Sequence, residues 1–257
     1  MNSGENLPEF NMALDEAMLD YSYQNSIPIL RFYKWKPPTL SIGYFQKTSS
    51  SVNFEELKNR GFAFIRRPTG GRAVLHNKEI TYSITLPISH KFLELSVIES
   101  YEILCKPIVK ALNDLNIKAY LSNEDDKEIN SPSCFAAPTF MDIKVKGKKL
   151  IGSAQTRDKR GLLQHGSILL DVDVCELFSV LNINGAVAER LIKKGREKIT
   201  SLSEEGFKEN EDELKSYLIK AYKDLLEIDF KPLEISSVRN INEYMLKYSS
   251  KEWNFRI

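Results

Sequence analysis

Five short segments rich in β-branched and aromatic residues crowd the first third of the chain, and they constrain the fold more than any other feature. Each is four to eight residues long and is bounded by a proline pair, a glycine-containing turn or a short helical pattern. Segments of this kind are typical of β-strands. We therefore expect a compact antiparallel set of strands at residues 29–35, 39–45, 62–67, 73–76 and 80–87.

Helical periodicity surrounds these segments. Residues 11–23 carry apolar side chains at helical spacing, with Asp15 largely off the apolar stripe. Asn53 followed three residues later by Glu56 is a capping-box pattern and predicts a short helix that ends at Gly61. Further helices are expected at residues 99–116, 174–182, 186–195 and 211–227.

The second half of the chain adds strands before it becomes helical. Residues 142–155 read as a hairpin with its turn at Gly147, and residues 162–171 as another strand of the same sheet. A polar stretch, residues 122–133, reads as an exposed loop that ends directly before Cys134. The expected fold class is α+β, with a mixed, largely antiparallel sheet packed with helices. We expect one catalytic domain over residues 1–257, with a helical C-terminal segment from about residue 174.

Composition narrows the class of protein. The 36 lysines and arginines nearly balance the 35 acidic residues, so no global charge favours nucleic acid as a partner. No run of about 18 apolar residues predicts a membrane span, and the N-terminus lacks a signal-peptide pattern, so we expect a cytoplasmic protein. The three cysteines are widely spaced and form no CxxC pair, which argues against a disulfide framework and a zinc site. We expect neither a metal nor a cofactor.

The segment RRPTGGRAVLH, residues 66–76, concentrates positive charge around a flexible bend. Glycines between strands can turn backbone NH groups toward one point, and flanking guanidinium groups would strengthen the binding of an anion there. An ordinary basic hairpin turn is the alternative. The segment matches neither the Walker loop nor the GxGxxG fingerprint.

Cys134, in SPSCFAAP, differs from the other two cysteines. Cys105 and Cys175 lie on helix patterns among leucines and read as small core residues, whereas serines and prolines around Cys134 suggest an irregular, reachable position. A thiol becomes a nucleophile where a neighbouring cation favours its thiolate. Lys149 lies in the second arm of the predicted hairpin and is a candidate for that cation, unless the lysines of the hairpin are simply a solvated tip.

Two histidines and a stretch of small residues complete the candidates. His76 and His165 lie at or near apolar strand segments and are possible bases of a Cys–His pair, although structural hydrogen bonding is the commoner role. The small residues Gly152, Ser153 and Ala154 in a strand pattern admit the close approach of another backbone or a thin ligand, or else tight packing.

Taken together, RRPTGGRAVLH, KKLIGSAQTR and LLQHGSILLD, in this order and spacing, resemble the lipoate-protein ligase A and biotin ligase superfamily. The resemblance extends over almost the whole chain and implies a mixed sheet packed with helices. It also implies that Lys149 lies beside the reactive acyl carbonyl. The substrate is expected to contact residues of the three motifs, namely Arg67, Gly70, Gly71, Arg72, Ala73, His76, Gly152, Ser153, Ala154, His165 and Gly166.

Within the superfamily, Cys134 upstream of the lysine hairpin resembles the cysteine of one type of octanoyltransferase. ATP-dependent ligases usually lack this cysteine, and they commonly carry an additional C-terminal domain, for which we expect the chain to be too short. The resemblance thus implies catalysis by Cys134 and Lys149, with octanoyl-acyl-carrier protein as donor and a lipoyl-domain protein or the glycine-cleavage H protein as acceptor. Gly70, Gly71 and the small residues around Ser153 would border the acyl chain.

Three other functions remain open on the sequence. One is an ATP-dependent lipoate ligase, and another is an amidotransferase that moves octanoyl groups between lipoyl-bearing proteins. The third is a non-catalytic module that binds a lipoyl or carrier protein.

Overall fold

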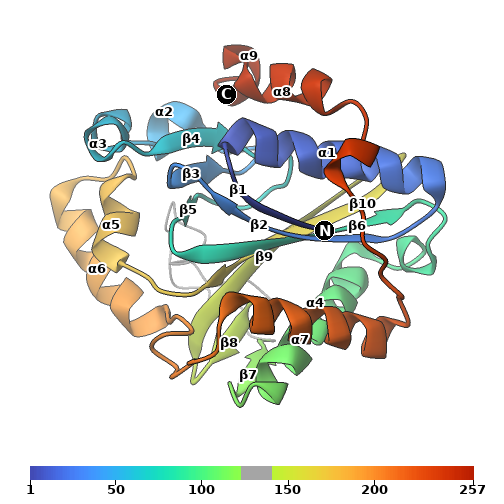
Figure 1. Cartoon of the computed structure of the whole chain (residues 1–257). Helices are drawn as coiled ribbons and strands as arrows, with labels where there is room; N and C mark the ends of the chain where they lie inside the picture. Colours follow the sequence, from blue (N-terminus) through green and yellow to red (C-terminus); the bar gives the residue numbers. More distant parts are fainter. Residues whose placement is uncertain (123–140) are drawn as a thin grey trace.

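The fold is built on two β-sheets, here in a computed structural model that describes residues 1–122 and 141–257 (Figure 1). The large sheet has seven strands, in the order β1-β2-β6-β10-β9-β8-β7. Its pairs are antiparallel except β1–β2. Along the chain these strands are β1 Asn2–Asn6, β2 Ile29–Trp35, β6 Glu79–Pro87, β7 Ala119–Leu121, β8 Ile143–Val145, β9 Lys148–Asp158 and β10 Gly161–Leu169.

The small sheet has three strands in the order β4-β3-β5. They are β3 Thr39–Ile42, β4 Ala63–Arg66 and β5 Val74–His76. Strand β3 pairs with β4 in parallel and with β5 antiparallel. The expectation of one compact antiparallel set was therefore wrong, because the five segments divide between two sheets and one pair is parallel. The predicted helix between β3 and β4 is the physical reason, since a strand–helix–strand crossover returns the chain in the same direction.

Helices cover both faces of the large sheet (Figure 1). Helices α4 and α7 pack together over one face, and α1 packs on the other face against β6, β10 and α8. The helices are α1 Pro8–Asn25, α2 Thr48–Ser51, α3 Phe54–Arg60, α4 Val97–Asp114, α5 Val174–Ser179, α6 Gly185–Lys198, α7 Glu211–Leu226, α8 Ile241–Ser249 and α9 Lys251–Asn254, with 3₁₀ turns at Lys91–Leu93 and Ile235–Ser237.

Local capping explains where several helices begin and end. The Asn53 side chain accepts a hydrogen bond from the Glu56 backbone NH, and Gly61 ends α3 with a φ of 67°. Ser96 and Glu99 form a reciprocal capping box at the start of α4, and that helix contains Pro107. The predicted helix and its caps at residues 53–61 are thus confirmed.

The largest cluster of buried apolar side chains lies between the large sheet and helices α4 and α7. Cys105 is fully buried in it, as expected. Cys175, by contrast, is exposed on α5, and Arg196 Nη2 donates to its sulfur over 3.2 Å. The prediction of a buried Cys175 was wrong, because α5 turns this residue away from the leucines on its other face.

The hairpin of β8 and β9 turns at Gly147, which has a φ of 81°, and β10 extends the same sheet. Both features were expected. The structure adds β1, α8 and α9, which the apolar pattern did not indicate. No helix in the described ranges has the length and apolar character needed to cross a membrane.

Candidate active site

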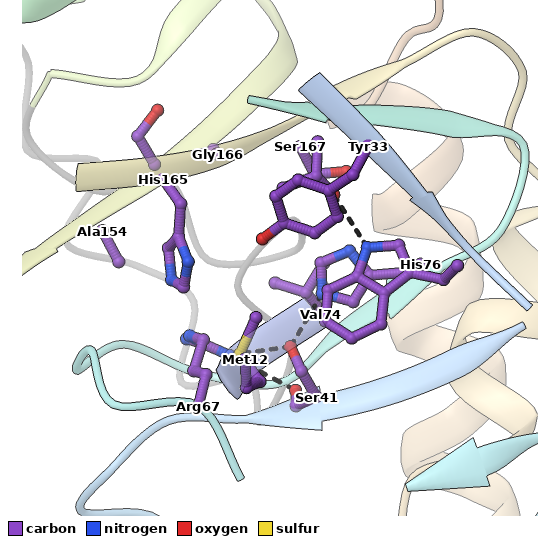
Figure 2. A pocket seen from close by; sticks show the side chains of 14 residues that line it. Met12, Tyr33, Ser41, Arg67, Val74, His76, Ala154, His165, Gly166 and Ser167 are labelled. Carbon is purple, nitrogen blue, oxygen red and sulfur yellow. Dashed lines mark hydrogen bonds between the residues drawn. The ribbon is translucent and has the colours of Figure 1, made fainter. Parts of the chain in front are cut away.

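A cavity lies between the two sheets and encloses about 390 Å³ of empty space, part of it open to solvent. In Figure 2 the His165 ring and Ala154 lie on one side of this space, with Met12 and Arg67 below and the His76 ring on the other side. The apolar side chains and glycines among these residues make the cavity narrow and largely apolar. Its lining consists of Met12, Tyr33, Trp35, Ser41, Arg67, Val74, His76, Thr81, Gly152, Ser153, Ala154, His165, Gly166 and Ser167.

A β-bulge places Lys149 on the sheet face that borders the cavity. The register of β8 and β9 shifts by one residue beside Ile143, and the consecutive residues Leu150 and Ile151 both pack in the core cluster under α4. Two adjacent residues on one face reverse the usual alternation. Lys149 therefore lies on the opposite face, which it shares with Gly152 three residues further along β9.

Lys149 is buried, with an exposed fraction of 1%. Its Nζ lies 2.8 Å from Oδ1 of Asp142, which is equally buried. The backbone of Lys149 is held as well, because its carbonyl accepts a hydrogen bond from the NH of Thr200. A buried carboxylate at this distance stabilises a charged ammonium. Lys149 is thus no part of a solvated hairpin tip, unlike Lys146 at the turn.

His165 stands between a hydroxyl and a buried carboxylate. Its Nε2 lies 2.7 Å from Thr69 Oγ1, and its Nδ1 lies 3.3 Å from Oδ2 of Asp15 on α1. Arg31 Nη1 donates to the same carboxylate over 2.7 Å, and both members of this pair are fully buried. Tyr33 OH also donates to Asp15. Burial raises the pKa of Asp15, but Arg31, His165 and Ser83 outweigh burial and hold it below its ordinary value.

His76 has a similar arrangement from the small sheet. Its Nε2 lies 2.8 Å from Ser41 Oγ, its Nδ1 lies 3.5 Å from Glu79 Oε1, and its ring stacks on Trp35. Ser167 Oγ donates to Glu79 over 2.7 Å. Burial lowers the pKa of His76, and Glu79 offsets only part of that effect. His76 is therefore neutral at pH 7.

Arg67 connects the two histidines through their hydroxyl partners. Its Nε donates to Thr69 Oγ1, and its Nη1 donates to Ser41 Oγ. Its Nη2 donates to the carbonyls of Gly70 and Arg72, each over 2.7 Å. The Arg67 guanidinium thus fixes the shape of the glycine turn at the cavity. This weakens the hypothesis that the arginines of the turn bind an anion, because the Arg67 guanidinium already donates its hydrogen bonds to other groups of the protein.

Arg66 points away from the cavity. Its Nη1 donates to the carbonyls of Gly43, Tyr44 and Gln46, and its Nη2 donates to Thr48 Oγ1. Its backbone NH donates to Asn254 in α9. Arg66 therefore ties the C-terminal helix to the small sheet.

The structure brings most of the expected substrate contacts together. The cavity is lined by seven of them, namely Arg67, His76, Gly152, Ser153, Ala154, His165 and Gly166. The remaining four, Gly70, Gly71, Arg72 and Ala73, are not among its lining residues; Gly70 borders a neighbouring hollow beside Gln155. Gly71 has a φ of 91°, and its carbonyl packs so closely on Gly43 that a side chain there would clash. Contact of these residues with substrate remains a prediction.

Cys134 lies outside the described residues. Neither of the two described cysteines, Cys105 and Cys175, has the properties of a reactive thiol at the cavity. Burial raises the pKa of the Cys105 thiol to about 12, so this group stays protonated at neutral pH. Cys175 lies on α5, outside the set of residues that line the cavity.

Sequence reasoning missed the buried carboxylates behind the histidines. Asp15 was expected largely off the apolar stripe of its helix, yet it is fully buried. The one available signal was Arg31, a charged residue between apolar residues of β2, because a charge that is buried requires a partner. Across residues 1–122 and 141–257, no group of three or more His, Cys, Asp or Glu side chains is arranged to hold a metal ion.

The structure thus combines a narrow, largely apolar cavity with a buried, ion-paired lysine on a strand that contributes to the cavity lining. A profile of the lipoyl protein ligase A/B catalytic domain matches residues 7–223. The chain belongs to this family. It is 41% identical to the octanoyltransferase LipM of Lysinibacillus sphaericus over 274 residues, which cover 100% of this chain and 98% of the relative. The protein is accordingly an acyltransferase.

Solved structures share the fold. A bi-partite lipoate protein ligase of Thermoplasma acidophilum, studied with its E2 lipoyl domain, has a TM-score of 0.79 and 25% identity, covering 99% of this chain and 94% of the other. A lipoate-protein ligase A bound with ATP has a TM-score of 0.78 and 25% identity, covering 99% and 96%. The expected α+β fold with a largely antiparallel sheet is confirmed.

Proposed function

We propose that this protein transfers an octanoyl group from octanoyl-acyl-carrier protein to the target lysine of a lipoyl-domain protein or of the glycine-cleavage H protein, through a thioester on Cys134. The observation that carries the proposal is Lys149, a buried ammonium on the face of β9 that continues into the cavity wall. At about 3.3 Å per residue, Gly152 follows Lys149 by about 10 Å along the strand. A straight acyl chain with its carbonyl near Lys149 would lie along this wall.

The first half-reaction moves the acyl group onto the enzyme. The Cys134 thiolate, stabilised by the Lys149 ammonium, attacks the carbonyl of the octanoyl thioester. The new C–S bond forms as the bond to the carrier sulfur breaks, and the carrier leaves as a thiolate that takes up a proton. Because the donor is already a thioester, the reaction needs no ATP.

The second half-reaction forms an amide. The neutral ε-amine of the acceptor lysine attacks the Cys134 thioester, the C–S bond breaks, and the cysteine returns to its thiolate. The proton lost by the attacking amine passes to Lys149 in its neutral amine form, which becomes the ammonium again. Asp142, 2.8 Å from Lys149 Nζ, keeps that group in place during both steps.

The cavity supplies binding energy for the octanoyl chain. Each CH₂ group moved from water into an apolar site contributes about 0.8 kcal/mol. Met12, Val74 and Ala154 offer such a surface. The hydroxyl–histidine groups of Thr69–His165 and Ser41–His76 bond to one another and to Arg67, so they impose little desolvation cost on the chain.

The decisive experiment is intact-mass analysis after mixing the protein with octanoyl-acyl-carrier protein, without ATP. We expect one octanoyl group on the wild type, none on Cys134→Ser, and transfer of that group when an apo lipoyl domain is added. Lys149→Met should lose acylation; because it also removes the cation beside the buried Asp142, circular dichroism is used to check that the variant is folded.

Other outcomes would replace the proposal. Strict dependence on ATP and free octanoate would identify a ligase, which the likeness to the ATP-bound lipoate-protein ligase A favours as the second candidate. Acylation only by an octanoylated lipoyl-bearing protein would identify an amidotransferase. Binding of the carrier with no gain of mass would identify a non-catalytic module.

A further inference from the structure

Helix α6 concentrates positive charge in an otherwise balanced chain. Its 14 residues contain Arg190, Lys193, Lys194, Arg196 and Lys198. Against these five cations stand two acidic residues, Glu189 and Glu197, which leaves a net charge of +3. The whole chain of 257 residues has a net charge of +1. Outside α6 the chain therefore carries 31 lysines and arginines against 33 acidic residues, so the excess of cations lies in α6.

One side of α6 packs against the protein, and its cations lie on the other sides of the helix. Leu191 and Gly195 are buried, and the helix packs against α5. Arg196, which donates to Cys175 on α5, lies at the edge facing that helix. Arg190 and Lys193 are exposed, and Lys194 and Lys198 are half-buried one turn apart, so they share the other edge. We call Arg190, Lys193, Lys194 and Lys198 the basic edge of α6; the exposed Glu197, four residues after Lys193, lies on the same edge and offsets one of its four charges.

The basic edge ends beside the proposed reaction centre. Ile199, the residue after Lys198, pairs with Lys149 in a parallel bridge, and the NH of Thr200 donates to the Lys149 carbonyl. Lys148 Nζ donates to the carbonyl of Arg196 at the end of the helix. At 1.5 Å per residue, the four cations extend over about 12 Å of helix from this point.

On the basis of the proposed function, we propose that the basic edge of α6 is the docking surface for the acyl donor, an acidic carrier protein that delivers its thioester to Lys149. Charge complementarity selects an acidic surface, and the carrier is the substrate protein whose thioester must reach this end of the cavity first. Opposite charges at the rim of such an interface accelerate encounter and set register more than they add contact area. The carrier body would lie over α6 while its flexible arm enters the site.

Charge outside the basic edge argues against a nucleic acid or an anionic membrane as the occupant. Glu204 and Glu205 lie in the segment after α6, and Glu205 pairs with Lys146 over 2.7 Å. This acidic pair interrupts the positive field next to the helix. An extended polyanion would meet it, whereas a compact acidic domain would not.

The test compares two charge-reversed variants. Lys193→Glu with Lys194→Glu reverses the basic edge, and Lys220→Glu with Lys231→Glu is the matched control, since both lysines are exposed and each variant changes the net charge by the same amount. Initial rates of Cys134 acylation are measured with octanoyl-acyl-carrier protein and with octanoyl-pantetheine, a small neutral donor. We expect KM for the carrier to rise about tenfold or more in the basic-edge variant alone, with unchanged rates on the small donor.

Binding of the holo carrier is measured in parallel by calorimetry at low and high salt, so that docking is read without transfer. A basic-edge variant that binds and accepts from the carrier like the control would overturn the docking surface while leaving the proposed function intact. A defect confined to the second step, with acyl-enzyme and lipoyl domain, would assign the surface to the acceptor and also overturn it. If the wild type neither binds the carrier nor forms the thioester from either donor, both proposals fail.

Discussion

The two histidines of the cavity have the same kind of neighbours but different charges behind them. His165 and His76 each lie between a hydroxyl group and a carboxylate. Behind His165, the carboxylate of Asp15 faces the buried guanidinium of Arg31. Behind His76, the carboxylate of Glu79 accepts hydrogen bonds from Thr81 and Ser167. The first group is a buried ion pair, and the second is a carboxylate that accepts hydrogen bonds from hydroxyl groups of the large sheet, with His76 of the small sheet 3.5 Å away.

The difference shows that hydrogen-bond patterns alone do not define the cost of a buried charge. A fully buried ion pair contributes little net stability when intact, yet removing one partner leaves a bare charge inside. A carboxylate satisfied by hydroxyl groups leaves only unsatisfied polar groups when it is replaced. The stability of the protein should therefore respond differently to a carboxylate-to-amide substitution at Asp15 and at Glu79.

Asp15→Asn should have the largest effect on stability. It leaves the Arg31 charge buried without its counter-ion, so we expect the free energy of unfolding to fall by about 3–5 kcal/mol. Denaturant unfolding followed by circular dichroism measures this loss. Asp171→Asn is the control, because Asp171 pairs with Lys78 at an exposed site over a similar distance, and there we expect a loss of about 0–1 kcal/mol. Equal losses in the two variants would contradict the ion-pair assignment.

Glu79→Gln should be less damaging. The amide retains one acceptor oxygen for Thr81 or Ser167, and the partners of Glu79 in the described part of the chain include no arginine, so we expect a loss of about 1–3 kcal/mol. The same unfolding measurement applies. A loss as large as that of Asp15→Asn would show that the two buried carboxylates, Asp15 and Glu79, do not differ in what their replacement costs.

Gly166→Ala and Gly70→Ala compare the packing around Gly166 in β10 with the packing around Gly70 in the glycine turn. A Cβ at Gly166 would lie 2.4 Å from Ser153 Oγ and 2.6 Å from Tyr82 Cε1, whereas a Cβ at Gly70 would meet nothing within 4 Å. We expect Gly166→Ala to lower the free energy of unfolding by about 1–3 kcal/mol, and Gly70→Ala to change it by less than about 0.5 kcal/mol. Thermal melting of both variants checks the difference. Similar losses of stability would show that the residues around Gly166 accommodate a methyl group as easily as those around Gly70.

The smallest effect concerns pH. The folded pKa of His76 is lowered by burial, so the unfolded chain binds the proton more readily and stability falls as the pH drops below the unfolded histidine pKa of about 6.5. The folded pKa of Asp15 is also lowered, and its contribution is lost only as the pH falls below about 4. The unfolding free energies of the wild type and of His76→Gln are measured between pH 7 and pH 5. The difference between the two should be largest at pH 7 and should shrink toward pH 5, because only the wild type loses the contribution of His76. Parallel curves would assign the acid loss to another group.

The apolar and turn patterns predicted much of the fold but only part of the site. Residues 29–35 and the hairpin at Gly147 follow from local preference for strand and turn, and the three motifs that indicated the family mark residues that line the cavity. The division of the strands into two sheets was not predicted, because strand pairing depends on contacts far apart in the chain.

The sequence by itself determined most of the elements, the family resemblance and the position of Lys149 in a hairpin. Only the tertiary structure decided which side chains meet. Asp15 and His165 are separated by 150 residues, and an exposed-looking helix position becomes buried when α1 packs across β6 and β10. Likewise, a single extra residue in β9 turns Lys149 to the cavity side. Local propensities depend on neighbours a few residues away, whereas burial and charge pairing depend on the whole folded chain.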